Sequence, residues 1–555
     1  MIITELQQLY AAHPNVEGMY RLLQDNSVRH LYCSGLCASA ASLFSSVLIQ
    51  RVECPFVFIL GDLEEAGYFY HDLTQILGTE QVLFFPSSFR RAIKYGQKDA
   101  ANEILRTEVL SRLQKGEEGL CVVTYPDALA EKVVSRKELG DKTLKLHLGE
   151  KVDMDFVTEV LRSYSFEYVD YVYEPGQYAV RGSIIDVFSF SSEFPFRIDF
   201  FGDEVESIRT FEVESQLSKE KKENIVIVPD LSHSLEQRGN GGMVSFLDFL
   251  QPDTLLAMKD FLWLRERIQT VHDEALTAQA IAAREAEENG LISLDGKLID
   301  GGEFTLRALD FRRIEFGTKP TGTPDATVTF NTTAQPIFHK NFDLVAESFH
   351  DYLSRNYALY ICSDSLKQTE RIRAIFEDRG DNISFTSVER TLHEGFADDA
   401  LRLCIFTDHQ LFDRFHKYNL KSDKARSGKV ALSLKELNQF TPGDYVVHTD
   451  HGVGRFTGLV RIPNGDTTQE VMRLVYQNDD VVFVSIHSLH KVSKYKGKEG
   501  EAPRLNKLGT GAWEKLKDRT KTKIKDIARD LIKLYSQRRE EKGFQYSPDS
   551  FFTPL

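Results

Sequence analysis

A phosphate-binding loop is the first chemistry to look for, because its glycine-rich backbone cradles phosphates and its lysine reaches the β- and γ-phosphates. Gly-Lys pairs occur in this chain at 296–297, 428–429 and 497–498. The residues five positions before each pair are not the glycine that the loop needs: they are Leu291, Asp423 and Val492. The residues after each pair lack the magnesium-binding hydroxyl: they are Leu298, Val430 and Glu499. The sequence therefore predicts no functional loop of this type.

A degenerate form of the loop follows the apolar run HLYCSG (30–35), which predicts a buried strand. The chain then continues as GLCASAAS, with two alanines where the Gly-Lys pair would stand. We interpret this segment as a structural strand-turn-helix that holds no nucleotide. Its marker residues are Gly35, Ala40, Ala41 and Ser42.

Two other patterns imitate catalytic or metal sites. Asp273-Glu274 matches part of a helicase acidic box, but the preceding RERIQTVH is polar and helical and predicts a solvated helix face. The pairs His448/His451 and His487/His490 have a spacing seen in zinc ligands. No cysteine or carboxylate set joins them, and residues i and i+3 of a strand point to opposite faces. We therefore predict turn histidines, no metal site and no catalytic residue.

The residues expected at the surface favour a binding function over catalysis. In VYEPGQYAVRGSIIDVF, Arg181 follows a turn and Phe188 lies further along, so an arginine beside an exposed aromatic residue is expected as an interface anchor. A merely solvated arginine at a strand edge is the alternative. Further on, strands around Val460–Ile462 and Val471–Tyr476 are expected to offer a free edge for another protein's strand. Gly452-Val-Gly454 predicts a tight hairpin beside them.

Composition favours protein partners. The chain has 555 residues and a net charge of −15, and an acidic body repels nucleic acid unless a basic patch overrides it. Such a patch lies at 513–543, where eleven Lys/Arg face six Asp/Glu. The six scattered cysteines favour reduced thiols in a cytoplasm. Neither a signal peptide nor a membrane-spanning run is expected.

The positioning elements follow from hydrophobic patterns. Apolar runs at 30–35, 55–60, 82–86 and 120–125, separated by helical stretches, predict a parallel α/β sheet. A β-rich module with a turn at Gly202-Asp203 is expected at about 150–213, a second α/β domain at 338–425 and a small barrel at 440–495. An amphipathic helix is expected last, with one apolar face: Leu516, Ile524, Ile527, Leu531 and Leu534.

Long motifs carry a resemblance to a known family. EPGQYAVRGSIIDVF followed by FPFRIDFFGDEVESIRTF resembles the UvrB-homology region of bacterial transcription-repair coupling factors. FTPGDYVVHTDHGVGRFTGLV, VSIHSLHKVSKY and LGTGAWEKLKDRTKTKIKDIARDLIKLYSQR resemble the RNA-polymerase-interacting, CarD-like module of the same family and its following helix. The similarity covers essentially the whole chain, in the expected order.

The resemblance implies a multidomain α/β protein. Its expected parts are a degenerate UvrB-like domain 1a (1–140), a UvrA-binding domain 2 (141–213), a domain 1b (214–337), a small α/β domain 3 (338–425), a CarD-like barrel (438–505) and a linker helix (510–543). A translocase that uses ATP and magnesium, and that provides most of the DNA contact, is expected beyond Leu555. This chain is then expected to need no cofactor and to be no enzyme.

The resemblance also implies partners. Arg181 and Phe188 are expected to face UvrA, and Val460, Arg461 and Ile462 to pair with the RNA polymerase β subunit. The function implied is to couple stalled polymerase to nucleotide excision repair in the bacterial cytoplasm. Glu167 stands where the family has an arginine, and no long aromatic hairpin for damaged DNA appears in 125–149. The alternatives are a stand-alone CarD-type regulator and a UvrB-like or helicase-like ATPase.

Overall fold

The computed structural model describes residues 1–88, 100–213, 216–231, 243–285, 297–414, 416, 418, 420, 441–464, 467–485, 492–495, 503–509, 511–513 and 515–520. The chain forms two compact units. The first contains residues 1–213 and 217–427, and the second contains 428–555 with 214–216. The six domain boundaries expected from the sequence stay a prediction within these units.

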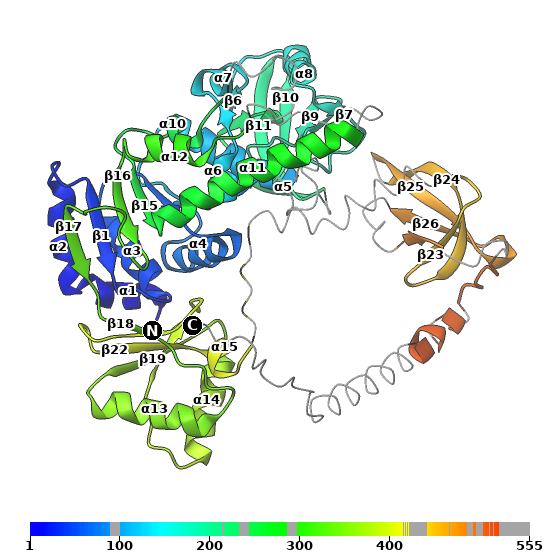
Figure 1. Ribbon diagram of the computed structural model, residues 1–555. Coiled ribbons are helices and arrows are strands. Elements are labelled where there is room, and N and C mark those ends of the chain that lie inside the picture. Colours follow the sequence, from blue (N-terminus) through cyan, green and yellow to red (C-terminus); the bar gives the residue numbers. More distant parts are fainter. Residues whose placement is uncertain are drawn as a thin grey trace. The chain divides into compact units, whose positions relative to one another are not determined.

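A seven-stranded parallel sheet forms the centre of the first unit (Figure 1). Its strand order is β17-β1-β16-β15-β2-β4-β3. The four strands predicted from apolar runs are confirmed: β1 (His30–Ser34), β2 (Phe56–Ile59), β3 (Val82–Phe85) and β4 (Cys121–Thr124). Three later strands join them: β15 (Leu255–Lys259), β16 (Arg312–Phe316) and β17 (Ala326–Thr329). The segments expected as domains 1a and 1b therefore share one sheet.

Helices cover this sheet because their apolar faces are buried against it. Asp62 caps α4 by accepting the Glu65 N–H, and Pro14 starts α2, where its missing N–H costs nothing. The helices are α1 (Ile3–Ala11), α2 (Pro14–Gln24), α3 (Ala40–Arg51), α4 (Leu63–Leu77), α5 (Ala100–Lys115), α6 (Pro126–Ala130), α7 (Arg136–Asp141), α10 (Phe246–Phe249), α11 (Phe261–Glu285) and α12 (Gly301–Ala308). Asp273-Glu274 lies inside α11, so the helical interpretation of this pair is confirmed.

The β-rich module is a six-stranded sheet in the order β12-β11-β10-β9-β8-β7. Helix α8 packs its buried Val157 and Leu161 into the same core as Ile185 and Ile198 of the sheet. Gly202, at φ +64°, makes the predicted turn between β10 and β11. The elements are β6 (Leu144–His147), α8 (Met154–Ser163), β7 (Glu167–Tyr168), β8 (Gln177–Arg181), β9 (Ile184–Val187), β10 (Phe196–Phe201), β11 (Glu204–Phe211), β12 (Ser218–Lys221) and β13 (Asn224–Ile227), which pairs with β6; β5 (Val133–Val134) and β14 (Met243–Val244) pair separately.

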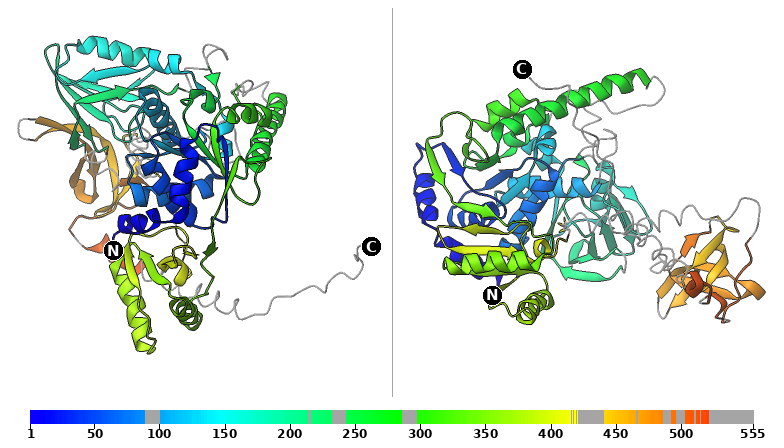
Figure 2. Two further views of the ribbon diagram at one scale, coloured as in Figure 1. Left: turned by 90° about the vertical axis from the view of Figure 1, so that its left-hand side faces the viewer. Right: turned by 60° about the horizontal axis from the view of Figure 1, so that its bottom comes forward.

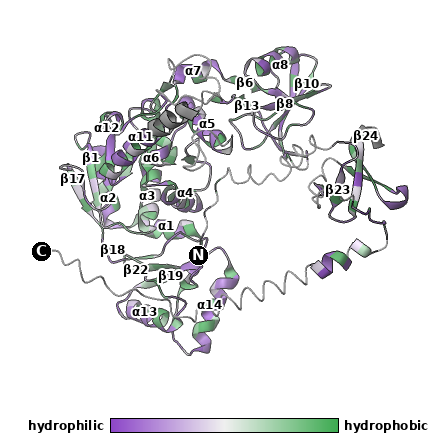
Figure 3. Ribbon diagram, turned by 45° about the vertical axis from the view of Figure 1, so that its right-hand side comes forward, coloured by the Kyte–Doolittle hydropathy of each residue, from purple (hydrophilic) through white to green (hydrophobic). Residues whose placement is uncertain are grey.

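The small α/β domain has a mixed sheet in the order β18-β21-β22-β19-β20. Figure 2 shows it in yellow-green beside the blue N-terminal helices, and Figure 3 shows hydrophilic and hydrophobic residues alternating along its helix α14. Its elements are β18 (Thr332–Ala334), α13 (Phe342–Ser354), β19 (Ala358–Ser363), α14 (Leu366–Asp378), β20 (Thr386–Glu389), β21 (Phe396–Asp398), β22 (Leu403–Thr407) and α15 (Asp408–Leu411).

The second unit contains an antiparallel sheet in the order β26-β25-β24-β23-β27. Its core includes Val446, Phe456, Met472 and Leu474. The elements are β23 (Tyr445–His448), β24 (Gly452–Asn464), β25 (Thr467–Val475), the 3₁₀ turn η1 (Gln477–Asp479), β26 (Val481–Ser485) and β27 (Val492–Lys494). Residues 515–520 are helical, and the predicted helix from 521 to 543 lies outside the described residues. In the part of the chain that is described, no helix has the length and apolarity of a membrane span.

Candidate functional site

Arg181 ends β8 at the tip of the β8–β9 hairpin, where Gly182 takes a positive φ of 60°. About a third of its side chain (36%) is exposed. The guanidinium pairs with Asp186 and donates to the Asp170 carbonyl over 3.3 Å. It also lies 5.1 Å from the centre of the Tyr171 ring. Arg181 is therefore held in one orientation while part of it faces solvent.

Asp186 of β9 forms ion pairs with two arginines, Arg181 and Arg197. Its carboxylate is buried and accepts two further hydrogen bonds from Arg197, from Nε over 2.8 Å and from Nη2 over 2.9 Å. The strand register sets Asp186 beside Arg197, Arg197 beside Arg209, and Arg209 beside Lys221. We call Arg181, Arg197, Arg209 and Lys221 the arginine row. Only Arg181 was expected from the sequence, although period-two alternation in FPFRIDFFGDEVESIRTF could have indicated the other two arginines.

Phe188 differs from the expectation. Its side chain is only 3% exposed and packs with buried apolar residues, so it is no exposed aromatic neighbour of Arg181. Its core neighbours are Ile104, Val172, Ala179, Phe190 and Phe211. Tyr171 takes the expected place beside the arginine. Glu167 is exposed on β7 and accepts a hydrogen bond from Gln177 over 3.2 Å.

The barrel strand β24 has one partner over the predicted binding segment. Val460, Arg461 and Ile462 lie opposite Val471, Glu470 and Gln469 of β25, respectively. Among the described strands, β23 pairs with β24 only from Gly452 to Arg455, so the β24 segment around Val460 has a second, unpaired edge. The matching expectation for β25 is wrong over Val471–Val475, because β26 pairs with that segment on its other side.

The degenerate loop forms the predicted strand-turn-helix between β1 and α3. Gly35 has a φ of +80°, and a Cβ at this position would lie 1.9 Å from the Phe330 carbonyl oxygen. Ala40 and Ser42 are buried at the start of α3, and Ala41 is half-buried. The Cys37 N–H donates to Thr332 Oγ1 over 3.0 Å. The loop backbone therefore has protein partners of its own.

The neighbouring strand ends are also paired internally. Lys259, the last residue of β15, forms an ion pair with Glu65 of α4. Asp260 follows and accepts the Thr318 N–H over 2.9 Å. An acidic residue after a central strand could serve a magnesium nucleotide, but this carboxylate is used by the loop after β16.

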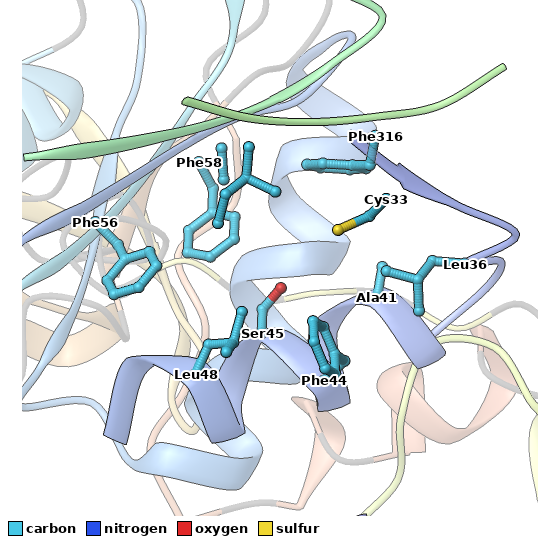
Figure 4. A pocket seen from close by; sticks show the side chains of 11 residues that line it. Cys33, Leu36, Ala41, Phe44, Ser45, Leu48, Phe56, Phe58 and Phe316 are labelled. Carbon is cyan, nitrogen blue, oxygen red and sulfur yellow. The ribbon is translucent and has the colours of Figure 1, made fainter. Parts of the chain in front are cut away.

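A cavity of about 20 Å³ lies between α3 and the sheet (Figure 4). Its eleven lining residues include no charged side chain, and Figure 4 shows the Ser45 hydroxyl among rings and aliphatic groups. Pockets for ligands the size of a nucleotide need roughly 300–1,000 Å³ and a few convergent polar groups. This cavity is therefore a packing gap.

The barrel histidines correct another expectation. The His448 and His451 rings stack with centroids 4.6 Å apart, whereas opposite faces were predicted. The reason is that His448 ends β23 and His451 lies in the turn before Gly452, whose φ of +79° confirms the predicted tight hairpin. His487 and His490 lie outside the described residues. Within the described ranges, no group of three or more His, Cys, Asp or Glu is arranged to hold a metal ion.

Family models of known proteins match the two segments that contain the candidate surfaces. Residues 144–233, which include the arginine row, match the family model of the UvrB interaction domain. Residues 440–496 match that of the CarD-like/TRCF RID domain. The transcription-repair-coupling factor of Bacillus subtilis (strain 168) is 25% identical over 588 residues, and that of Staphylococcus aureus (strain USA300) is 24% identical over 597 residues.

Each of these alignments covers 93% of this chain and 49% of the relative, so the chain spans about half the length of the curated relatives that it matches. Both relatives are bacterial proteins. The chain is thus homologous to the transcription-repair-coupling factors over about half of their length, and it carries their UvrB interaction and CarD-like domains.

Proposed function

We propose that this chain is the adaptor part of a transcription-repair-coupling factor in a bacterial cytoplasm, binding RNA polymerase with one unit and UvrA with the other. The observation that carries the proposal is the presence of both matched domains in one chain that aligns with such factors over 93% of its length. Coupling would follow because the polymerase stalled at a lesion and the repair protein UvrA are held by the same molecule.

The unpaired edge of β24 supports polymerase binding. A strand with a free edge can add a strand of another protein, since backbone hydrogen bonds give affinity and a few side chains give specificity. Val460, Arg461 and Ile462 lie on this edge, and the proposed partner is a β-strand of the polymerase β subunit.

The arginine row supports UvrA binding. Arginine is frequent among residues that dominate binding energy, because a preorganised guanidinium loses little freedom on binding. Arg181 meets this condition through Asp186, Asp170 and Tyr171. Phe188 enters this proposal only as core support for the hairpin, because its side chain is buried.

The adaptor is proposed to act without catalysis of its own, with ATP and magnesium used by a translocase outside this chain. The internally paired degenerate loop favours this over an ATPase with an unusual site. The alternative of a stand-alone CarD-type regulator would need only the second unit, whereas the alignment extends through the first.

Binding of the purified chain to UvrA and to the N-terminal region of the polymerase β subunit tests the proposal, with ATP hydrolysis followed in parallel. We expect both partners to bind without hydrolysis. Arg181→Ala should weaken UvrA alone, against the control Arg162→Ala on α8, which covers the other face of the sheet. Val460→Asp should weaken the polymerase fragment alone, against Val481→Asp on β26. Binding of neither partner, or ATP turnover above background, would contradict the proposal.

A further inference from the structure

The start of α3 is covered by residues 391–395, which connect β20 to β21 of the small α/β domain. The two segments exchange hydrogen bonds. The Ser39 N–H donates to the Glu394 carbonyl over 3.4 Å, and the Glu394 N–H donates to Ser39 Oγ over 3.0 Å. Ser39 is the residue before α3, where a nucleotide-binding loop would present its amides to a phosphate.

The buried side chain of an aspartate lies at the start of α3, where a nucleotide-binding loop would hold a phosphate. Asp72 comes from α4, and its side chain accepts hydrogen bonds from Ser39 Oγ over 2.6 Å and from Ser42 Oγ over 2.8 Å. It also accepts the His393 N–H over 2.7 Å. A carboxyl group at a helix N-terminus lies where the helix dipole favours negative charge. One side chain therefore ties α3, α4 and the 391–395 segment together.

Further contacts fix the small domain to the first sheet at two flanking places. The Tyr68 ring of α4 stacks on His393 with a centroid distance of 3.5 Å. On the other side, the Tyr10 hydroxyl donates to the buried Asp398 over 2.5 Å, and the Met1 amine donates to the Ser387 carbonyl over 3.1 Å. The covering of α3 is therefore part of an extensive joint.

We infer that Asp72 and the 391–395 segment are a built-in substitute for a nucleotide: they occupy the phosphate position of the degenerate loop and hold the small α/β domain onto the first sheet without any ligand. In a nucleotide-binding α/β protein, such a contact between two domains would depend on the ligand. Here the contact is made by protein groups alone, so the task of the small α/β domain is to cover the degenerate loop. The inference does not depend on which partners the chain binds.

Amide hydrogen exchange of the whole chain, measured at pH 8, tests the inference. Asp72→Leu removes three acceptor contacts at once, so we expect the His393 and Glu394 amides to exchange at least about tenfold faster. Amides of the central strand β4 should keep their protection. The control Asp62→Ala changes the N-cap of the same helix and should speed exchange only at the start of α4. Ser39→Ala is a milder second variant, which removes the acceptor of the Glu394 N–H and one donor to Asp72, so it should act mainly on the Glu394 amide.

Two results would overturn the inference. One is unchanged protection of His393 and Glu394 in both Asp72→Leu and Ser39→Ala. The other is slower exchange of the loop at 35–42 when magnesium-ATP is added to the parent chain, because a filled phosphate position has no room for it. Restoring the Gly-Lys pair with the double substitution Ala40→Gly and Ala41→Lys should not create magnesium-ATP binding while the joint is intact.

Discussion

Replacing Arg181 by alanine should weaken UvrA binding strongly while lowering the free energy of unfolding only slightly. The buried Asp186 carboxylate keeps both hydrogen bonds from Arg197 in this variant, so it is not left without a charged partner. The losses are one ion pair that is about a third exposed, one bond to a carbonyl and the contact with the Tyr171 ring. Partly exposed ion pairs and cation–π contacts contribute about 0.5–1 kcal/mol each, so the free energy of unfolding should fall by about 1 kcal/mol.

The expected loss in UvrA binding is larger. An arginine anchor at a protein interface contributes about 2 kcal/mol or more, which corresponds to at least about thirtyfold in Kd. Arg181→Lys should recover only part of this, because lysine keeps the charge but lacks the planar fork that Asp186 orients. Arg162→Ala should leave the affinity unchanged.

Urea unfolding and titration calorimetry with purified UvrA measure the two quantities on the same samples. The reasoning fails if Arg181→Ala binds UvrA as tightly as the parent. It also fails if the free energy of unfolding falls by about 3 kcal/mol or more, since Arg181 would then be a structural residue whose loss disturbs the whole hairpin.

Three further predictions concern other parts of the chain. Gly35→Ala should lower the free energy of unfolding by more than about 2 kcal/mol in a urea titration, because the new Cβ would overlap the Phe330 carbonyl at a positive φ. Trp513→Phe should destabilise the second unit by about 1 kcal/mol, seen as a lower thermal midpoint of that unit, because the indole N–H donates to the Thr449 carbonyl over 2.9 Å. Acid should weaken the joint of the small domain: burial, helped by neighbouring histidines, lowers the pKa of His393 to about 3. The unfolded value is 6.5, so this stability is present above pH 6.5 and is lost as the pH falls towards 3; urea midpoints between pH 8 and 4 should show it, with a smaller slope in His393→Gln.

The same joint should also weaken on the alkaline side. Burial raises the pKa of Asp72 from 3.8 to about 7, against the opposing effect of its hydrogen bonds. A raised pKa means stability that is present at low pH and lost as the pH rises through 7. His71, His409 and His416 lower the pKa values of neighbouring histidines, whereas the carboxylates of Asp364 and Asp408 raise them. Between pH 3.8 and 6.5 the Asp72 trend opposes the His393 trend, so the acid loss due to His393 is measured as the difference in urea midpoint between the parent and His393→Gln, and the loss due to Asp72 is complete above about pH 7.

The sequence was sufficient to predict most strands of the central sheet, but it was not sufficient to predict which side chains and strand edges are exposed. Buried parallel strands need long apolar runs, so β1 to β4 could be predicted directly. The expected exposure of Phe188 was wrong because a second core, which includes Ile104 of α5, covers its side chain. The expected free edge of β25 was wrong because β26, a later segment of the chain, pairs with it. His448 and His451 were expected on opposite faces of a strand, but the strand ends at His448, and the turn that follows brings the two rings together.

The cover over the degenerate loop could not be predicted at all, because it joins residues more than 300 positions apart. It nevertheless gives the degenerate loop contacts that do not depend on a lysine or a nucleotide. A helix that starts inside a protein needs partners for its first N–H groups and an environment that suits its positive end. A nucleotide supplies both in an ATPase, whereas here the Glu394 carbonyl accepts the Ser39 N–H and the Asp72 side chain accepts hydrogen bonds from the Ser39 and Ser42 hydroxyls. The lysine is therefore only one of the missing requirements: a nucleotide would also have to displace a carboxylate that is already hydrogen-bonded to both flanking segments. This favours an adaptor whose fold is complete without ATP over an enzyme with a concealed site.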